Sequence, residues 1–210
     1  MRYCLLEPVA EIFQAAVTLQ SAVKAHLNSD SGEAERLIRE ADDPKIRLWT
    51  ERIWGKQSPE IHGFSQRPDS PPHLPVAQRP LPRMPVRSTQ DLIIRRDGYH
   101  CRFCGIPVIR RDIRQAMHRR YPDALPWGRT NETQHAAFQC MWLQFDHLLP
   151  NTRGGHSGLE SILVTCAPCN FGRMEWTIDE AGLNDPRDRI LHDHWAGFAT
   201  WRGLEEFIDR

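Results

Sequence analysis

Four of the six cysteines in this 210-residue chain form two Cys-x-x-Cys pairs, and this spacing constrains the fold more than any other feature. The first pair is Cys101 and Cys104, and the second is Cys166 and Cys169. Each pair can hold one tetrahedral ion from a tight turn, and four thiolates make the closed ligand shell of structural zinc. A redox role is the alternative for such pairs, but neither has a thioredoxin-like context. Four thiolates would leave no position for a substrate water.

Length and composition exclude several classes of protein. No run approaches the roughly 18 apolar residues that span a bilayer. Glu7 and Glu11 interrupt the N-terminal segment where a signal peptide needs a continuous apolar stretch. We therefore expect a soluble, cytoplasmic protein without a membrane partner. A chain of this length can bury about 70% of its unfolded surface, enough for one domain or two small ones.

The formal net charge is zero, but the charges are unevenly distributed. Residues 79–130 hold twelve arginines against four aspartates, a net charge of +8, whereas residues 1–62 have −2 and residues 175–210 have −5. A basic middle between acidic ends can present a phosphate-binding face. The alternative is that these arginines are ordinary solvated cations. The basic segment 110–120 has the same two interpretations, as a groove-tracking helix or a solvated one.

Residues 1–57 are expected to form a helical module. Apolar side chains recur at helical spacing over 8–28, a second helix begins near Asp30 with Glu33 completing a capping box, and a third begins at Pro44 and ends before Gly55. The module lacks a catalytic constellation, so we expect dimerisation, recruitment of a protein partner, or packing on the rest of the chain. Residues 58–87 hold eight of the 16 prolines and should form an extended linker or a strap over the surface.

The second module, 88–176, has a mixed pattern of helices and strands. We expect a tight turn around the first cysteine pair, a glycine-rich loop over 150–158 and a loop over 121–134. Helices are predicted over 91–97 and 110–120 and after Cys166, and strands over 135–145 and 162–165. The remaining residues, 177–210, read as an acidic helical extension with Trp195, Phe198 and Trp201 on its inner face.

Two segments together resemble the signature of the HNH endonuclease family. The first runs from Phe145 to Gly155 and includes Asp146-His147 and Gly154-Gly155, and the second is Cys166-Ala-Pro-Cys169-Asn170. With the first cysteine pair, the match is similar to the zinc-bearing, treble-clef branch of that family. It covers roughly residues 98–176. The resemblance implies a fold in which two strands and a helix surround a metal site.

The resemblance also implies a role for each matching residue. His147 would be the general base that activates water, and Asp146 and Asn170 would supply oxygen ligands to one Mg²⁺ or Mn²⁺. Arg153 and Arg173 flank the site, where they would bind phosphate oxygens or remain solvated charges. Where the family has a second asparagine that orients the histidine loop, this chain has Ser161.

Together these patterns predict an α+β protein with a helical N-terminal module and a zinc-stabilised treble-clef, HNH-like domain. Its function would be metal-dependent hydrolysis of DNA phosphodiester bonds, in a restriction or phage-defence setting where such nucleases are common. One alternative is a non-catalytic zinc module that binds DNA or a protein. A third hypothesis is an interaction protein that self-associates through its N-terminal helices.

Overall fold

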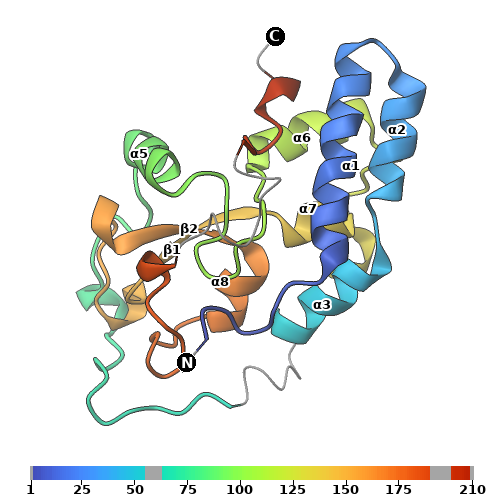
Figure 1. The fold of residues 1–210 in the computed structure, drawn as a ribbon. Helices are drawn as coiled ribbons and strands as arrows, with labels where there is room; N and C mark the ends of the chain where they lie inside the picture. The colour runs from blue at the N-terminus through green and yellow to red at the C-terminus, as the bar shows by residue number, and fades with distance from the viewer. Residues whose placement is uncertain (1, 55–62, 190–199, 209–210) are drawn as a thin grey trace.

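The structure is a computed structural model that describes residues 2–54, 63–189 and 200–208 (Figure 1). Helices combine with one small antiparallel sheet, which confirms the α+β class. The helices are α1 (Ala10–Leu27), α2 (Ser31–Glu40), α3 (Pro44–Trp54), α5 (Arg87–Asp97), α6 (Arg111–Arg120), α7 (Ala136–Cys140) and α8 (Ala167–Arg173). The strands are β1 (Leu143–His147) and β2 (Ile162–Cys166). Short 3-10 turns are η1 (Val76–Gln78), η2 (Asn131–Thr133), η3 (Asn151–Arg153), η4 (Leu159–Ser161), η5 (Pro186–Asp188) and η6 (Glu205–Phe207).

The three N-terminal helices form where the sequence predicts them. Asp30 caps α2, since its Oδ1 accepts a hydrogen bond from the Glu33 backbone N–H at 3.0 Å. The Glu33 carboxylate accepts from Arg36 Nε at 2.7 Å instead of from the Asp30 backbone N–H, so the expected capping box is only half formed. α3 begins at Pro44, whose missing N–H costs nothing in the first turn. α1 and α2 run side by side (Figure 1).

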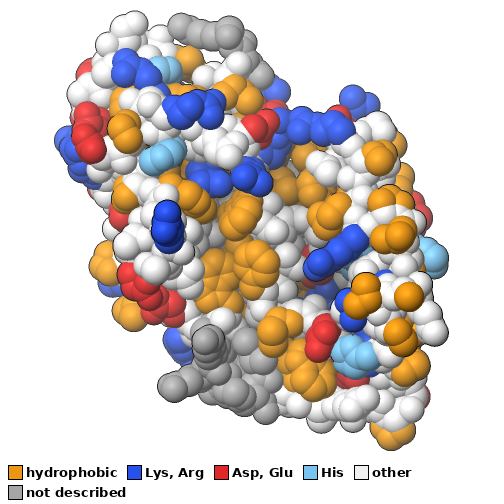
Figure 2. Space-filling model, turned by 180° about the vertical axis from the view of Figure 1, so that it is seen from behind, with side chains coloured by type: hydrophobic (Ala, Val, Ile, Leu, Met, Phe, Trp, Pro, Cys, Tyr) orange, Lys and Arg blue, Asp and Glu red, His pale blue; other side chains and the backbone are white. Residues whose placement is uncertain are grey.

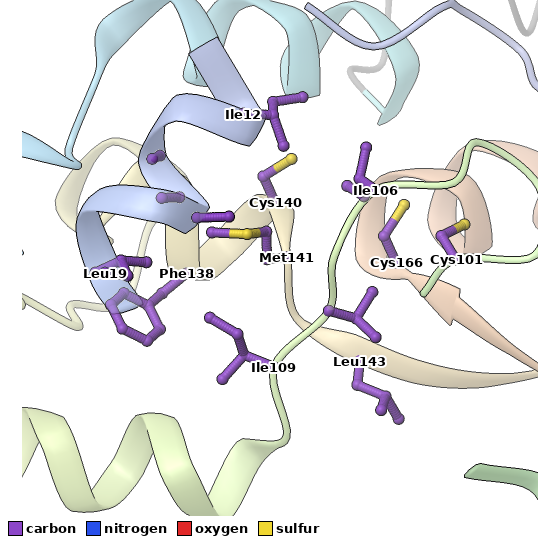
Figure 3. Close-up of a cluster of buried hydrophobic side chains, with 14 of the residues drawn as sticks. Ile12, Leu19, Cys101, Ile106, Ile109, Phe138, Cys140, Met141, Leu143 and Cys166 are labelled. Carbon is purple, nitrogen blue, oxygen red and sulfur yellow. The ribbon is translucent and has the colours of Figure 1, made fainter. Parts of the chain in front are cut away.

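The hydrophobic core is continuous from these helices to the cysteine pairs. In Figure 3, Ile12 of α1 lies beside Cys140 at the end of α7, and Ile106 lies between this group and Cys166. α3 packs against α8 so closely that a Cβ on Gly172 would lie 2.4 Å from Ile53 Cγ2. Apolar burial therefore holds the N-terminal helices against the segment that follows the second cysteine pair.

The predicted strand over 135–145 is wrong in its first half. Residues 136–140 form the helix α7, in which Met141 N–H donates to the Ala137 carbonyl at 2.8 Å. Every residue of α7 is buried, including Gln139 at 1% exposure. A short segment covered on all sides has no exposed face to reveal its period, so a strand and a helix cannot be distinguished in the sequence.

The two strands form a hairpin in the register His147 opposite Ile162. The loop between them turns at the two adjacent glycines. Gly154 has φ +95°, a conformation that side chains disfavour, and a Cβ on Gly155 would lie 1.7 Å from the Leu149 carbonyl oxygen. The glycine pair therefore fixes the loop as the sequence indicates.

The proline-rich segment lies along this loop over its described part, residues 63–86. Leu74 N–H donates to the Thr152 carbonyl at 2.8 Å, and Asn151 Nδ2 donates to the Pro80 carbonyl at 3.0 Å. Most residues from 65 to 84 remain exposed. Of the two arrangements expected for this segment, it adopts the surface strap, and we use that name for residues 63–86.

The remaining helices differ from expectation mainly at their ends. α5 begins at Arg87, four residues before the predicted start, and α6 matches its prediction. The expected C-terminal helix does not form in the described parts of 177–210, which contain only the turns η5 and η6. Trp201 is buried and its Nε1 donates to the Val108 carbonyl at 3.1 Å, whereas Trp195 and Phe198 lie outside the described residues. Among the described helices, none has the length and apolar character to cross a membrane.

Candidate functional site

The four cysteines of the two pairs converge on one point. The sulfur atoms of Cys101, Cys104, Cys166 and Cys169 all lie within 4.8 Å of one another, and all four residues are buried. Cys104 Sγ and Cys166 Sγ are 3.6 Å apart, too far for a disulfide. A tetrahedral zinc with Zn–S bonds of about 2.3 Å would hold its sulfurs about 3.8 Å apart. The cluster therefore fits a metal ion such as zinc.

Local backbone structure places each cysteine pair. Gly105 N–H donates to the Cys101 carbonyl at 2.8 Å, and Gly105 has φ +82°, so the turn after the first pair needs glycine. Cys104 N–H approaches Cys101 Sγ at 3.5 Å. Cys166 is the residue before α8, and Cys169 lies in the first turn of that helix. A turn and a helix start thus present two thiols each to the same point.

Burial alone would keep these sulfurs protonated. It raises the pKa of the Cys166 thiol well above its ordinary value and also raises the pKa of Cys104. Charged thiolates so close together need a cation to balance them. The donor set therefore matches a thiophilic metal and provides no open position.

Arg102 from the basic region and Arg189 from the acidic C-terminal segment support the first cysteine turn. The Arg102 guanidinium donates to the carbonyls of Pro186 at 3.0 Å and Arg189 at 3.1 Å, and Arg189 in turn donates to the Phe103 carbonyl. Arg102 N–H also donates to the Val164 carbonyl of β2 at 2.9 Å. These side chains bind backbone groups of the protein itself, so part of the predicted phosphate-binding charge is structural.

His147 ends β1 and is held by the hairpin loop. It is 7% exposed, and its Nε2 lies 3.1 Å from Ser157 Oγ. Ser157 Oγ in turn donates to the strap, with the Pro82 carbonyl at 2.7 Å and the Arg83 carbonyl at 2.9 Å. Burial, with smaller contributions from Arg173 and Arg83, lowers the pKa of His147 to about 4. The imidazole is therefore neutral at neutral pH and can accept a proton.

The tautomer of His147 follows from counting protons. A serine hydroxyl has one proton to donate. The strap carbonyls have no proton and can only accept, so Ser157 donates its proton to the nearer one, the Pro82 carbonyl. Ser157 Oγ can then only accept from His147, which places the imidazole proton on Nε2 and leaves Nδ1 as the basic nitrogen.

Asp146 forms a buried ion pair with Arg173. Arg173 Nη2 donates to Asp146 Oδ2 at 2.7 Å and to the His147 carbonyl at 2.6 Å. Arg173 Nε also reaches Oδ2, at 3.3 Å, so both contacts use one carboxylate oxygen and Oδ1 lies outside the pair. Burial raises the pKa of Asp146, and Arg173 opposes that shift. Arg173 thus joins the carboxylate, the histidine and α8.

The two arginines predicted to bind phosphate are buried in ion pairs instead. Arg173 is 1% exposed. Arg153 is 4% exposed, and its Nη2 donates to both carboxylate oxygens of Glu180, at 3.2 and 3.1 Å. Its Nη1 donates to the Pro71 carbonyl of the strap at 2.5 Å. Neither guanidinium faces solvent, and both position the hairpin, a role that sequence spacing did not indicate.

The remaining predicted residues lie on the same hairpin and helix. Asn170 is half-buried in α8, and its side-chain amide has no hydrogen-bond partner among the described residues. The Ser161 hydroxyl is likewise unpartnered within the described ranges, and Ser161 supports the hairpin through its carbonyl, which accepts from Leu148 N–H at 2.8 Å. The serine whose hydroxyl contacts the His147 ring is Ser157, in the glycine-rich loop.

No protein-family model matches the chain, and neither a curated protein nor a solved structure matches it. The site is therefore interpreted from its own residues.

Proposed function

We propose that the chain is a zinc-stabilised, metal-dependent endonuclease of the HNH type that hydrolyses DNA phosphodiester bonds. The observation that carries the proposal is the arrangement of the hairpin and α8. Asp146 and His147 end one strand, and the helix that follows the other strand carries Asn170 and contacts both residues through Arg173. The same helix begins at the second cysteine pair. Zinc in the cluster would complete a treble-clef scaffold beneath the hairpin.

His147 would act as the general base. Its Nδ1 takes a proton from water, the water oxygen bonds to phosphorus, and the bond from phosphorus to the leaving oxygen breaks. The low pKa of the imidazole keeps this nitrogen free of protons at neutral pH. Ser157 and the strap hold the opposite nitrogen, so the ring can turn its basic edge to only one side.

Asp146 and Asn170 would hold the catalytic Mg²⁺ or Mn²⁺, since carboxylate and amide oxygens are ligands that these hard cations accept. Bound there, the ion would stabilise charge on the phosphate and the leaving oxygen. Arg173 orients Asp146 through Oδ2 and leaves Oδ1 for the ion. Water and phosphate oxygens would supply the other ligands.

A non-catalytic zinc module that binds DNA or protein is the second candidate. The Asp146–Arg173 ion pair favours this second candidate, because a carboxylate whose charge is already neutralised by a buried guanidinium attracts a metal cation less strongly. Cleavage separates the two functions, since a binding module would show none.

The test is cleavage of supercoiled plasmid and of labelled single-stranded and branched DNA by the purified chain, with Mg²⁺, with Mn²⁺ or with EDTA. We expect nicking that requires a divalent ion and is lost in His147→Ala. His156→Ala is the matched control, because His156 is an exposed histidine of the same loop. Zinc content is measured for each variant. Equal nicking by the His147 variant would remove the base assignment, and zinc-loaded protein without cleavage would favour the binding module.

A further inference from the structure

Arg114 of α6 is a buried cation without an anion. It is 6% exposed, and its guanidinium carbon lies 3.5 Å from the ring centroid of Trp127 and 5.7 Å from that of Trp142. Its guanidinium makes no hydrogen bond or ion pair within the part of the chain that the structure describes, and Nε is completely shielded. Burial and the neighbouring Arg111 lower the pKa of Arg114 to about 10. An external anion would satisfy this charge.

The two tryptophans begin a row of aromatic side chains. The ring centroids of Trp127 and Trp142 are 6.2 Å apart, those of Trp142 and Phe171 6.3 Å, and those of Phe171 and Trp54 5.4 Å. The three tryptophans are half-buried, and Phe171 is 41% exposed. We call these four residues the aromatic row. It crosses from the loop after α6 over the start of β1 to α8 and α3, so it uses the elements that carry Asp146 and Asn170.

A groove continues from the row between α5 and α6. Its volume is about 430 Å³, and its lining includes Trp142 just before β1, Phe145 of β1, Arg111 of α6 and Gln90 of α5. Arg111 is exposed and has no ion pair among the described residues. On the face drawn in Figure 2, arginine and lysine side chains stand beside a group of hydrophobic ones. Cations and exposed rings thus occur together, as a nucleic-acid ligand requires.

We propose that the aromatic row and the adjacent arginines bind single-stranded DNA. Unpaired bases would stack on the exposed parts of Trp142 and Phe171, and a backbone phosphate would pair with Arg114 and Arg111. A duplex offers its phosphates but hides its base faces, so it would use only the arginines. The choice of DNA as the ligand rests on the proposed nuclease function. That the aromatic row can stack bases rests on its geometry alone.

The test is fluorescence anisotropy of a labelled single-stranded oligonucleotide and of the matching duplex. Full-length, zinc-loaded protein in a His147→Ala background is used without added divalent ion, so the probe stays intact. Arg114→Gln removes the unpaired cation and Phe171→Leu removes an exposed ring. Arg39→Gln is the charge-matched control, because Arg39 is exposed on α2 and, among the described residues, forms an ion pair with Glu35 alone. Thermal unfolding checks that each variant is folded.

We expect Arg114→Gln and Phe171→Leu each to raise the Kd for the single strand by about fivefold or more. Arg39→Gln should stay within about twofold of the parent, and Phe171→Leu should leave duplex binding unchanged. If Arg114→Gln is unfolded, Phe171→Leu and Arg111→Gln carry the test. Unchanged single-strand binding in the folded variants, or an equal loss with Arg39→Gln, would overturn the proposal. Because binding is measured without cleavage, the binding result can be interpreted even if the protein proves not to be a nuclease.

Discussion

At the scale of single residues, one hydroxyl determines which edge of His147 is basic. Ser157 donates its proton to the strap and accepts from Nε2, so Nδ1 is the nitrogen that can accept a proton. The sequence predicted a different contact, in which Ser161 holds the histidine-bearing loop in place. The resemblance identified the need for a polar side chain in the loop, but the position depends on how the strap, more than 70 residues earlier, lies against the loop. Sequence spacing carries no information about that contact.

Replacing Ser157 tests this orientation. Ser157→Ala should lower kcat for plasmid cleavage by about tenfold or more, because the ring loses the partner that selects its tautomer. Ser157→Thr keeps a hydroxyl and should retain most of the activity. Zinc content and unfolding temperature should stay near the parent values in both variants. Full activity in the alanine variant would show that the ring is held by other contacts.

The pH dependence of stability should reflect His135. Its Nε2 donates to the Ile38 carbonyl at 2.8 Å, and burial lowers the pKa of the ring below 6.5. As pH falls through 6.5, the unfolded chain binds a proton that the folded chain does not, so the free energy of unfolding falls with pH. It should fall by up to about 1.4 kcal/mol per pH unit from this group until the folded pKa is reached.

Urea unfolding at about pH 7.5 and about pH 5.5 measures this effect. His135→Gln removes one titrating group and should make the profile less steep, leaving the slope that His147 adds. His156→Gln, an exposed histidine, should follow the parent. A profile for His135→Gln parallel to that of the parent would mean that the ring is not held neutral.

At the scale of elements, the hairpin loop is anchored by the buried Arg153–Glu180 ion pair, which has side-chain exposures of 2% and 0%. Arg153→Met should destabilise the protein by about 3–5 kcal/mol, because the Glu180 carboxylate is left buried and unpaired. The double variant Arg153→Met/Glu180→Leu should recover most of that loss. Urea unfolding measures both, with Arg36→Gln as the control for an exposed pair.

Cleavage by the same variants separates two roles for Arg153. If the arginine only holds the loop, the double variant should regain activity along with stability. A double variant that is stable but inactive would return Arg153 to the phosphate-binding role predicted from the sequence.

The sequence predicted the elements that carry their own local signals. Asp30 and Pro44 mark the starts of helices, and the glycine pair at 154–155 marks the hairpin turn. The prediction failed at α7, where burial on every side removes the periodic pattern. The cysteine cluster was predictable because paired spacing encodes it directly. The buried partner of Arg153 could not be predicted, since Glu180 is distant from the loop in sequence and no motif links the two residues.

At the scale of the whole molecule, the continuous core predicts that the helices of 1–54 unfold together with the hairpin. Ile53 is fully buried in α3 and faces Gly172 of α8. Ile53→Ala should destabilise the whole protein by about 2–5 kcal/mol through a cavity between them. Leu48, on the same helix and 61% exposed, should tolerate alanine within about 0.5 kcal/mol.

Calorimetry and zinc release, followed along the same temperature ramp, measure this coupling. We expect a single transition in which zinc leaves as the helices melt, shifted to lower temperature in Ile53→Ala. Two separate transitions, with only the first one shifted, would mean that the N-terminal helices fold independently of the zinc site.

We propose that the protein has two metal sites with separate roles, a sulfur site that stabilises the fold and an oxygen site that takes part in catalysis. The most direct measurement is metal content, with zinc by mass spectrometry and Mn²⁺ binding by electron paramagnetic resonance, in the parent, Cys166→Ser, Cys140→Ala and Asp146→Ala. Cys140 is a buried cysteine outside the cluster and should leave both metals in place. We predict that Cys166→Ser loses zinc and folding, whereas Asp146→Ala keeps zinc and loses only Mn²⁺. A folded Cys166→Ser without zinc would contradict the scaffold role, and unchanged Mn²⁺ binding in Asp146→Ala would contradict the catalytic site.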